Sequence, residues 1–266
     1  MRTLYNGCSR GEDVKYLQYL LIQNGYDVAM DGSFGPLTEK AVKQYQKAHN
    51  LKDDGSVGPK TRKVMGLTDF MVWILDPKEY ELWTAGTKYG SESYPLKTLE
   101  TWCREENADM TWNLAFFNRS DGGKKKDQYG VIKGRTITYV KSKGYDVGYG
   151  GTKERLWFDS KNGFAGYKLA VKNGVRKSVS TSGKRARNAN GQLKDGRFFV
   201  VQSVNKQTEY AIVSHMVTNY KVDTMFIQDA GGSTGFYYKK KDALIACERE
   251  GSNGRPVATV VCARKK

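Results

Sequence analysis

The chain has 266 residues, a formal net charge of +16, a hydrophobic content of 39%, 29 glycines and 5 prolines. This composition is typical of a folded globular protein and excludes a disordered or collagen-like chain. No segment approaches the roughly 18 apolar residues of a membrane span, and the first residues lack the apolar core of a signal peptide. We therefore expect a protein that is made in the cytoplasm without a signal peptide, has no membrane span, and is large enough for two domains.

The positive charge is concentrated beyond residue 68. Residues 1–68 hold 10 basic and 7 acidic side chains, so about +13 of the net charge lies in the rest of the chain. A basic surface attracts polyanions, which include nucleic acids and the anionic polymers of a bacterial cell wall. The basic residues are not interleaved with aromatic residues in a stacking pattern, so we expect no nucleic-acid partner. The composition leaves the oligomeric state open.

The cysteines lie far apart in the sequence and form no Cys-x-x-Cys pair. They are Cys8, Cys103, Cys247 and Cys262. This spacing indicates neither a zinc knuckle nor a disulfide scaffold, so mostly buried free thiols are expected. Placement of Cys247 and Cys262 on neighbouring strands would permit a disulfide without requiring one.

An internal repeat organises residues 1–67. The segment Asp31–Thr38 recurs as Asp54–Thr61, and each copy has an Asp-Gly turn followed by a Gly-Pro pair. A proline in the first turn of a helix loses no hydrogen bond, so each copy is predicted to begin a helix. Helical spacing is also present in the apolar positions ahead of the first copy (Val14, Leu17, Leu21) and between the copies (Val42, Tyr45, His49). The sequence therefore predicts a small all-α three-helix bundle.

This pattern resembles the peptidoglycan-binding family that accompanies many cell-wall hydrolases. The resemblance rests on Gly11–Gln18, Asn24–Tyr26, the two Asp-Gly turns and Ala41–Gln46. It implies that residues 1–67 bind peptidoglycan and hold a neighbouring domain at its insoluble substrate. Together with the lack of a signal peptide, it suggests a phage-lysin-like protein that acts at the bacterial cell wall.

Residues 70–266 are predicted to form a larger mixed α/β (α+β) domain. Two helices are expected, at 95–107 and at 208–220, where Tyr210, Val213, Val217 and Tyr220 form an apolar stripe. Strands are expected at 70–75, 81–85, 110–117, 136–140, 197–204, 224–227 and 256–262. The succession of a strand, a helix and an apolar strand near the C-terminus places the expected site at the ends of strands.

Histidine is too scarce here for most wall-hydrolase chemistry. Beyond His49 only His215 remains, and it lies off the apolar stripe of its helix. A zinc site with several histidines therefore cannot form, and the cysteines stand in no nucleophile motif. The sequence leaves a divalent cation at Asp229 and the neighbouring backbone open, but because the carboxylates do not cluster as a hard-cation site requires, no metal or other cofactor is indicated. The chemistry is expected to rest on carboxylates, arginines and amides.

Four segments of this domain resemble the phosphodiester glycosidase family, whose named activity removes N-acetylglucosamine from a sugar-phosphate diester. They are Asn113–Asn118, Arg185–Arg187 with Asp195–Val201, Asp229–Thr234, and Arg255–Val257. The chain departs from the family pattern at Ala230, where a glycine is usual, and at Leu114-Ala115, where the family has Ala-Gly. The first departure shortens a glycine run in the loop that is expected to line the pocket.

The same segments have a chemical interpretation of their own. Asp229 follows an apolar strand and opens a Gly-Gly-Ser-Thr turn, so its carboxylate is our candidate catalytic base or nucleophile. The guanidinium groups of Arg185 and Arg255 are candidates for stabilising a phosphate. The candidate substrate-binding residues are Asn113, Asn118, Arg187, Gly231, Gly232, Ser233 and Thr234.

The leading hypothesis is a wall-targeted hydrolase that cleaves a sugar-1-phosphodiester in an anionic glycopolymer such as teichoic acid. One alternative is a muralytic glycosidase, an endolysin or autolysin that uses Asp229 with Asp195 or Glu209 to cut peptidoglycan strands. Asp223 also lies near a predicted strand end. The other alternative is a protein without catalysis that binds wall polyanion.

Overall fold

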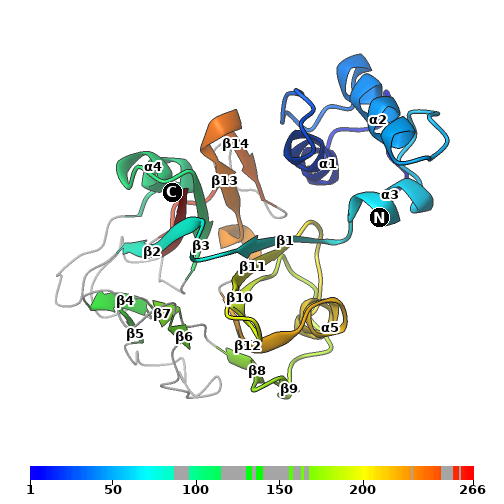
Figure 1. The fold of residues 1–266 in the computed structure, drawn as a ribbon. Helices are drawn as coiled ribbons and strands as arrows, with labels where there is room; N and C mark the ends of the chain where they lie inside the picture. Colours follow the sequence, from blue (N-terminus) through cyan, green and yellow to red (C-terminus); the bar gives the residue numbers. More distant parts are fainter. Residues whose placement is uncertain are drawn as a thin grey trace. The chain divides into compact units, whose positions relative to one another are not determined.

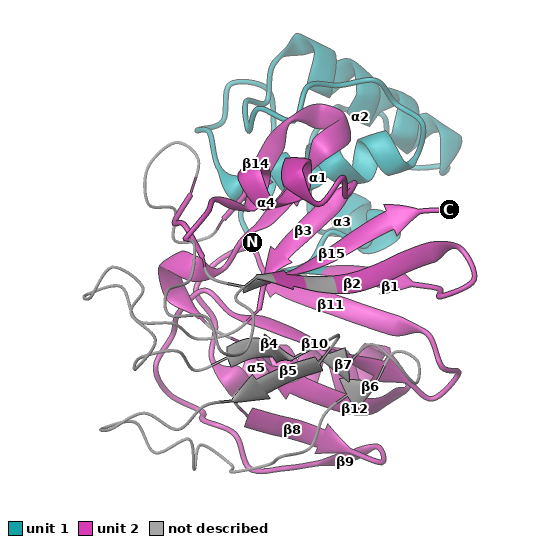
Figure 2. Cartoon of the chain, turned by 90° about the vertical axis from the view of Figure 1, so that its left-hand side faces the viewer, with its two compact units in different colours: residues 1–71 teal, residues 72–266 magenta. Residues whose placement is uncertain are grey.

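The computed structural model describes residues 1–86, 96–114, 130–133, 136–139, 156–157, 163–164, 168–228, 230–246, 254–257 and 259–266. These residues divide into two compact units, Met1–Met71 and Val72–Lys266 (Figure 2). The first consists of helices, and the second is rich in antiparallel sheets with added helices, so the predicted α+β organisation is confirmed. None of the helices in the described ranges has the length and hydropathy needed to cross a membrane.

The first unit contains α1 (Glu12–Gln23), α2 (Pro36–Ala48) and α3 (Pro59–Met65). As the repeat predicted, α2 and α3 each begin with a proline that follows an extended glycine. The helical faces expected to be apolar are buried at Val14, Leu17, Leu21 and Val42, which are all 0% exposed. Burial of these side chains provides the main stabilisation of this unit.

Each Asp-Gly turn of the repeat is held by a buried glutamine from the helix before it. The Gln18 side chain accepts a hydrogen bond from Gly32 N (2.8 Å) and donates to Asp31 Oδ1 (2.8 Å) and Ser33 O (3.0 Å). Burial alone would raise the pKa of the Asp31 carboxyl, but hydrogen bonds from the Ser33 amide and Gln18 lower it below its ordinary value.

The second copy repeats this arrangement. Gln46 accepts from Gly55 N (2.9 Å) and donates to Ser56 O (2.9 Å), Thr61 Oγ1 (3.1 Å) and Asp54 Oδ1 (3.3 Å). The hydrogen bond from the Ser56 amide is the largest cause that lowers the pKa of Asp54. The repeat in the sequence is therefore also a repeat of one polar network.

The second unit is built around two sheets (Figure 1). The six-stranded sheet has the order β1-β11-β10-β12-β8-β9 and the five-stranded sheet has the order β14-β13-β3-β15-β2. The strands of the first are β1 (Phe70–Leu75), β8 (Lys168–Lys172), β9 (Val175–Arg176), β10 (Asn188–Leu193), β11 (Phe198–Ser203) and β12 (Val222–Ile227). Those of the second are β2 (Tyr80–Gly86), β3 (Met110–Asn113), β13 (Phe236–Tyr238), β14 (Ala243–Ile245) and β15 (Thr259–Lys265). Two short pairs, β4 (Gly130–Lys133) with β5 (Thr136–Tyr139) and β6 (Leu156–Trp157) with β7 (Gly163–Phe164), are also antiparallel.

The direction of three strands decides which residues share an edge. Because β11 and β12 both pair with β10 in antiparallel fashion, they run the same way with β10 between them. Helix α5 (Glu209–Asn219) connects β11 to β12. The ends of β11 and β12 and the start of β10 therefore lie at one edge of the six-stranded sheet.

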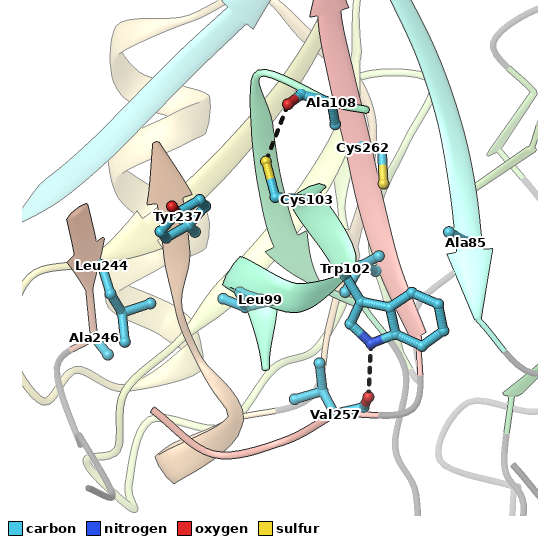
Figure 3. Packing of buried hydrophobic residues seen from close by; sticks show 11 residues of the cluster. Ala85, Leu99, Trp102, Cys103, Ala108, Tyr237, Leu244, Ala246, Val257 and Cys262 are labelled. Atoms are coloured by element: carbon cyan, nitrogen blue, oxygen red, sulfur yellow. Dashed lines mark hydrogen bonds between the residues drawn. The ribbon is translucent and has the colours of Figure 1, made fainter. Parts of the chain in front are cut away.

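The two sheets are joined by aromatic packing. Trp73 on β1 lies 5.2 Å from Trp112 on β3 and 4.2 Å from Phe236 on β13, measured between ring centroids. Helix α4 (Leu99–Glu105) packs on the five-stranded sheet (Figure 3). Trp102 donates to Val257 O at 2.9 Å, which ties α4 to the segment that leads into β15.

The cysteines of this region are free thiols. Cys103 and Cys262 are both 0% exposed within the cluster around α4. Burial raises the pKa of Cys103 to about 11 and raises that of Cys262 well above its ordinary value. The sequence allowed a disulfide between Cys262 and Cys247, but Cys262 is free and Cys247 lies outside the described residues.

Some predicted elements differ from the structure. β8, β10, β13 and β14 were not expected, and the last strand begins three residues later than predicted, at Thr259. The helix expected at 95–107 is shorter, since it begins only after the Thr98 N-cap. The apolar stripe expected on α5 was correct only in part: Val213 is buried as predicted, but Tyr210 is 51% exposed, and Ile212 and Met216 complete the buried face.

Candidate active site

A row of three buried amide side chains marks the sheet edge where β11 and β12 end. Asn188 on β10 pairs with Gln202 on β11, and Gln228, just after β12, donates its backbone N–H to Asn188 O at 2.9 Å. All three are at most 1% exposed. Since neighbours in register share a face of a sheet, these amides form one polar row across three strands.

This row is hydrogen-bonded to the five-stranded sheet. Asn188 Nδ2 donates to the main-chain oxygen of Asn113 at 2.7 Å and to its side-chain oxygen at 3.0 Å. The side-chain oxygen of Asn113 also accepts from Gly235 N at 3.2 Å, and Gln202 donates to Ile245 O at 3.1 Å. The predicted residue Asn113 is therefore buried between the sheets and connects β3, β10 and the turn that follows β12.

The glycine-containing turn after β12 meets two other predicted segments. Gly231 has a positive φ of 72° and donates its N–H to Ala186 O at 3.0 Å. Arg255 Nη1 donates to Ser233 Oγ at 3.3 Å. Gly231–Ser233 form a short 3₁₀ turn, and Thr234 follows it at 0% exposure. Segments that are distant in sequence, at 113, 186–188, 231–235 and 255, thus converge at one edge.

The two arginines of the 185–187 segment occupy different environments. Arg187 is 6% exposed, and its guanidinium donates to Gly183 O (2.6 Å), Gln207 O (3.2 Å) and Glu209 Oε1 (3.4 Å). Arg185 has an exposed side chain, while its backbone pairs with that of Gln207. Arg185 is therefore available to solvent, whereas Arg187 is engaged by protein acceptors.

Glu209, at the start of α5, is the centre of a largely buried ionic cluster. Its second oxygen accepts from Lys168 Nζ at 3.1 Å and from Ser180 N at 3.0 Å, while Arg187 contacts the first. Among the described residues, two cations therefore contact one carboxylate. This is an excess of one positive charge beside the edge, which favours anions nearby.

Two carboxylates named in the sequence analysis lie at the opposite end of the sheet. Asp195 follows β10, is 53% exposed and forms an ion pair with Arg197 at 2.8 Å. Asp223 is the second residue of β12, and its side chain accepts from Thr224 Oγ1. Because β10 has six residues, its ends are about 17 Å apart. Asp229 and Asn118 lie outside the described residues.

The amide row was missed by the sequence analysis. Only its β10 member had a signal in the sequence. Asn188, Asn190 and Gln192 alternate along that strand, which puts polar side chains on one of its faces. In the described part of the chain, several buried atoms of this region have no hydrogen-bond partner: Asn188 Oδ1, Asn190 Oδ1, Gln202 Oε1, Thr234 Oγ1, and both side-chain polar atoms of Gln228. Buried polar groups are normally paired, so this edge retains an unused capacity for hydrogen bonding.

The described residues include no group of three or more His, Cys, Asp or Glu side chains that could hold a metal ion. The described polar groups at this edge are amides, hydroxyls and guanidinium groups, with the carboxylate of Glu209 and the ammonium of Lys168 beside them.

Comparison with known proteins identifies the first unit. Residues 10–65 match the family model of the peptidoglycan binding domain. A peptidoglycan-binding protein from Clostridioides difficile, solved with glutamine hydroxamate, is 38% identical over 24% of this chain and 40% of its own, with a TM-score of 0.24. This chain thus spans 40% of the length of that protein. The Burkholderia AP3 phage endolysin is 42% identical over 24% of each chain, with a TM-score of 0.23.

The second unit has a structural likeness of its own. The catalytic domain of zebrafish N-acetylglucosamine-1-phosphodiester alpha-N-acetylglucosaminidase, auto-inhibited by its pro-peptide, aligns over 74% of this chain and 83% of its own. The TM-score is 0.50 and the identity is 13%, a level that shows a shared fold. No curated protein sequence matches the chain. Residues 10–65 are therefore a peptidoglycan-binding domain, joined to a larger α+β unit with the fold of the zebrafish catalytic domain.

Proposed function

We propose that this protein is a cell-wall-targeted hydrolase that cleaves a sugar-1-phosphodiester, of the N-acetylglucosamine-1-phosphate type, in a wall-attached glycopolymer. The observation that carries the proposal is the convergence of four distant segments at one sheet edge, through Asn188–Asn113, Gly235–Asn113, Gly231–Ala186 and Arg255–Ser233. The fold shared with the zebrafish phosphodiester glycosidase supports the same reaction class.

The charges at the edge suit departure of a phosphate. Arg255 lies beside Ser233, Arg185 is exposed next to Ala186, and the Glu209 cluster retains one excess positive charge. Such groups stabilise negative charge that develops on a leaving group. A phosphate leaving group needs less protonation than a sugar hydroxyl, so one carboxylate is enough for cleavage of the bond between the anomeric carbon and the phosphate oxygen. We assign the role of base or nucleophile to Asp229.

The peptidoglycan-binding domain gives the reaction its location. A binding module linked to a catalytic unit raises the effective concentration of that unit at an insoluble substrate. Teichoic acid joined to the wall through an N-acetylglucosamine-1-phosphate unit combines this location with this bond. A secondary wall polysaccharide with a similar phosphodiester link meets the same requirements, and a phage-lysin-like role is consistent with both.

The alternative of a muralytic glycosidase requires two carboxyl groups about 5–10 Å apart across the scissile bond. Asp195 lies beyond the far end of β10, about 17 Å or more from the candidate edge, so it is too far from that edge to act as the second carboxyl group. Glu209 lies near the edge, but Lys168, Ser180 and Arg187 already bind its two oxygens. These contacts favour the phosphodiester reaction over the glycosidase.

The test incubates teichoic-acid-bearing walls with the wild-type protein, with Asp229→Asn, and with the matched control Asp195→Asn. Soluble phosphate polymer and new reducing ends are measured separately. The proposal expects polymer release by wild type and Asp195→Asn, none by Asp229→Asn, and intact glycan strands throughout. New reducing ends without polymer release would establish the muralytic alternative. If the wild-type protein sediments with the walls but produces neither soluble polymer nor new reducing ends, the alternative of a wall polyanion binder without catalysis remains.

A further inference from the structure

The side chain of Gln228 is buried at the candidate edge without a hydrogen bond. It is 1% exposed, and neither its amide nitrogen nor its amide oxygen has a partner among the residues that the structure describes. A buried polar atom without a partner destabilises a fold, so nearly all such atoms in native proteins are paired with protein, water or a ligand. Gln228 has two of these atoms, and it directly precedes Asp229, the carboxylate proposed for the reaction.

The other two members of the amide row are fixed by their nitrogen atoms. Asn188 Nδ2 donates to Asn113, and Gln202 Nε2 donates to Ile245 O at 3.1 Å. Asn113 and Ile245 belong to the five-stranded sheet, so the row lies between the two sheets. The oxygens Asn188 Oδ1 and Gln202 Oε1 accept from no donor in the described part of the chain. The row thus combines two oriented acceptors with one amide, that of Gln228, which can turn without breaking a hydrogen bond.

The amide row is uncharged, although charged groups lie near it. Arg255 contacts Ser233 at the same edge. Lys168 and Arg187 contact Glu209 beside it. Amides do not compensate the charge of a phosphate, whereas guanidinium groups do. The row instead suits a neutral group that both donates and accepts hydrogen bonds.

The spacing of the row selects an amide over a hydroxyl. Its three members come from three neighbouring strands, which are about 4.8 Å apart. A sugar hydroxyl donates and accepts through a single oxygen atom. The N–H and C=O of a trans amide point in opposite directions, so one acetamido group reaches a donor on one strand and an acceptor on the next.

We propose that Gln228 binds the acetamido group of the sugar whose anomeric bond is cleaved, and thereby selects an N-acetylated sugar. Gln228 Nε2 donates to the acetamido oxygen, and Asn188 Oδ1 accepts from the acetamido N–H. The reaction itself rests on the proposed function. The acetamido group stands on the carbon next to the anomeric carbon, and Gln228 stands next to Asp229, so recognition and cleavage occur side by side.

Replacement of Gln228 by methionine separates this role from a structural one. Methionine has nearly the same shape and no hydrogen-bonding amide, so it removes the two unpaired atoms and keeps the volume. Gln192→Met is the matched control, because Gln192 lies at the opposite end of β10 and donates to Gly196 O at 3.1 Å. Thr234→Val is the second variant. Thr234 is 0% exposed, its hydroxyl has no partner in the described ranges, and it precedes Gly235, whose N–H binds Asn113.

The experiment uses the full chain and two soluble probes, the methyl diesters of N-acetylglucosamine 1-phosphate and of glucose 1-phosphate. The probes differ only in the acetamido group, which is a hydroxyl in the second. Binding is measured by titration calorimetry in the Asp229→Asn background, and hydrolysis is measured without that substitution as the release of free sugar. Scanning calorimetry gives the melting temperature of the second unit in each variant.

Gln228→Met is expected to bind the acetamido diester about 10–100-fold more weakly, since a buried polar group of the ligand loses its partner. KM should rise by a similar factor and kcat should change less, because the contact is made in both the ground state and the transition state. Binding of the glucose diester should change little, so the preference between the probes is lost. The melting temperature should stay the same or rise, because no hydrogen bond within the protein is removed.

Thr234→Val should reduce the same preference, and it decides the matter if Gln228→Met does not fold. Gln192→Met should keep the wild-type preference. A wild type that binds neither diester, or both equally, would overturn the inference. An unchanged preference in Gln228→Met would also overturn it, as would equal weakening of both diesters with a lower melting temperature, which a structural role predicts. If the wild type hydrolyses neither diester but the binding preference depends on Gln228, the proposed function fails and this site stands.

Discussion

Replacement of Gln46 by methionine tests the claim that one buried amide organises each Asp-Gly turn of the first unit. Methionine has nearly the shape of glutamine and fills the same space without hydrogen bonds. The change removes the acceptor for Gly55 N and the donor for Ser56 O and Thr61 Oγ1. Gln46 itself is 1% exposed, so water does not readily replace these bonds.

The expected cost follows from the groups left without a partner. A buried donor that loses its partner costs about 1–3 kcal/mol, and the loss of an ordinary hydrogen bond costs about 1 kcal/mol. Gly55 N loses its partner, whereas Ser56 O loses the bond from Gln46 but keeps the longer one from Thr61 Oγ1 at 3.4 Å. The Gln46→Met variant should therefore lose about 3 kcal/mol in free energy of unfolding of the first unit. For a domain of this size, 1 kcal/mol shifts the melting temperature by about 4–8 °C, so a decrease of about 12–24 °C is expected.

Scanning calorimetry of the full chain measures this decrease, with Gln44→Met as the matched control. Gln44 is an exposed glutamine on the same helix, so its replacement should change the melting temperature by only a few degrees. The transition of the second unit should stay where it is in both variants. A Gln46→Met transition within about 4 °C of wild type would refute the reasoning, because it would mean that the turn holds without the amide.

Three further predictions concern ionisable groups. Because the pKa values of Asp31 and Asp54 are lowered in the folded state, their stabilisation is complete above the ordinary value of 3.8 and is lost as pH falls through the folded values. The melting temperature of the first unit should thus fall between about pH 5 and pH 2, and a constant value would contradict this. Cys103, with a pKa of about 11, should resist alkylation at neutral pH while the partly exposed Cys8 reacts, as peptide mass mapping measures. Glu209→Gln should lower the free energy of unfolding of the second unit by about 3 kcal/mol in chemical denaturation, because two cations lose their carboxylate.

The first unit could be predicted closely because its determinants are local. The repeated Asp-Gly and Gly-Pro pairs specify turns and helix starts within a few residues, and the structure places α2 and α3 at Pro36 and Pro59 as expected. The role of Gln18 and Gln46 was not visible in the same pattern, because each binds a turn that is not adjacent in the sequence. The partners of Gln18 lie 13 and 15 residues away, and those of Gln46 lie 8 and 10 residues away.

The central strand β10 could not be predicted from local preference. Its sequence, Asn-Ala-Asn-Gly-Gln-Leu, contains residues that are depleted in strands. Gly191 is required where it stands, because a Cβ would lie 2.1 Å from Thr224 O and 2.6 Å from a ring carbon of Phe199. The strand forms because its backbone is hydrogen-bonded on both sides, to β11 and to β12. These partners come from other parts of the sequence, so the local sequence of β10 does not predict the strand.

Strand direction also explains why the acidic residues near strand ends are not equivalent. Asp195 precedes β11 and Asp223 stands near the start of β12, so both lie at the end of the sheet opposite the candidate edge. Glu209 follows β11 and lies near the candidate edge, where Lys168 and Arg187 neutralise it. Asp229 directly follows Gln228, whose backbone is bound to Asn188 at that edge. Asp229, which is next to Gln228 in the chain, is therefore the carboxylate that we propose for the reaction, and a reaction with one carboxylate favours a leaving group, such as phosphate, that carries its own charge.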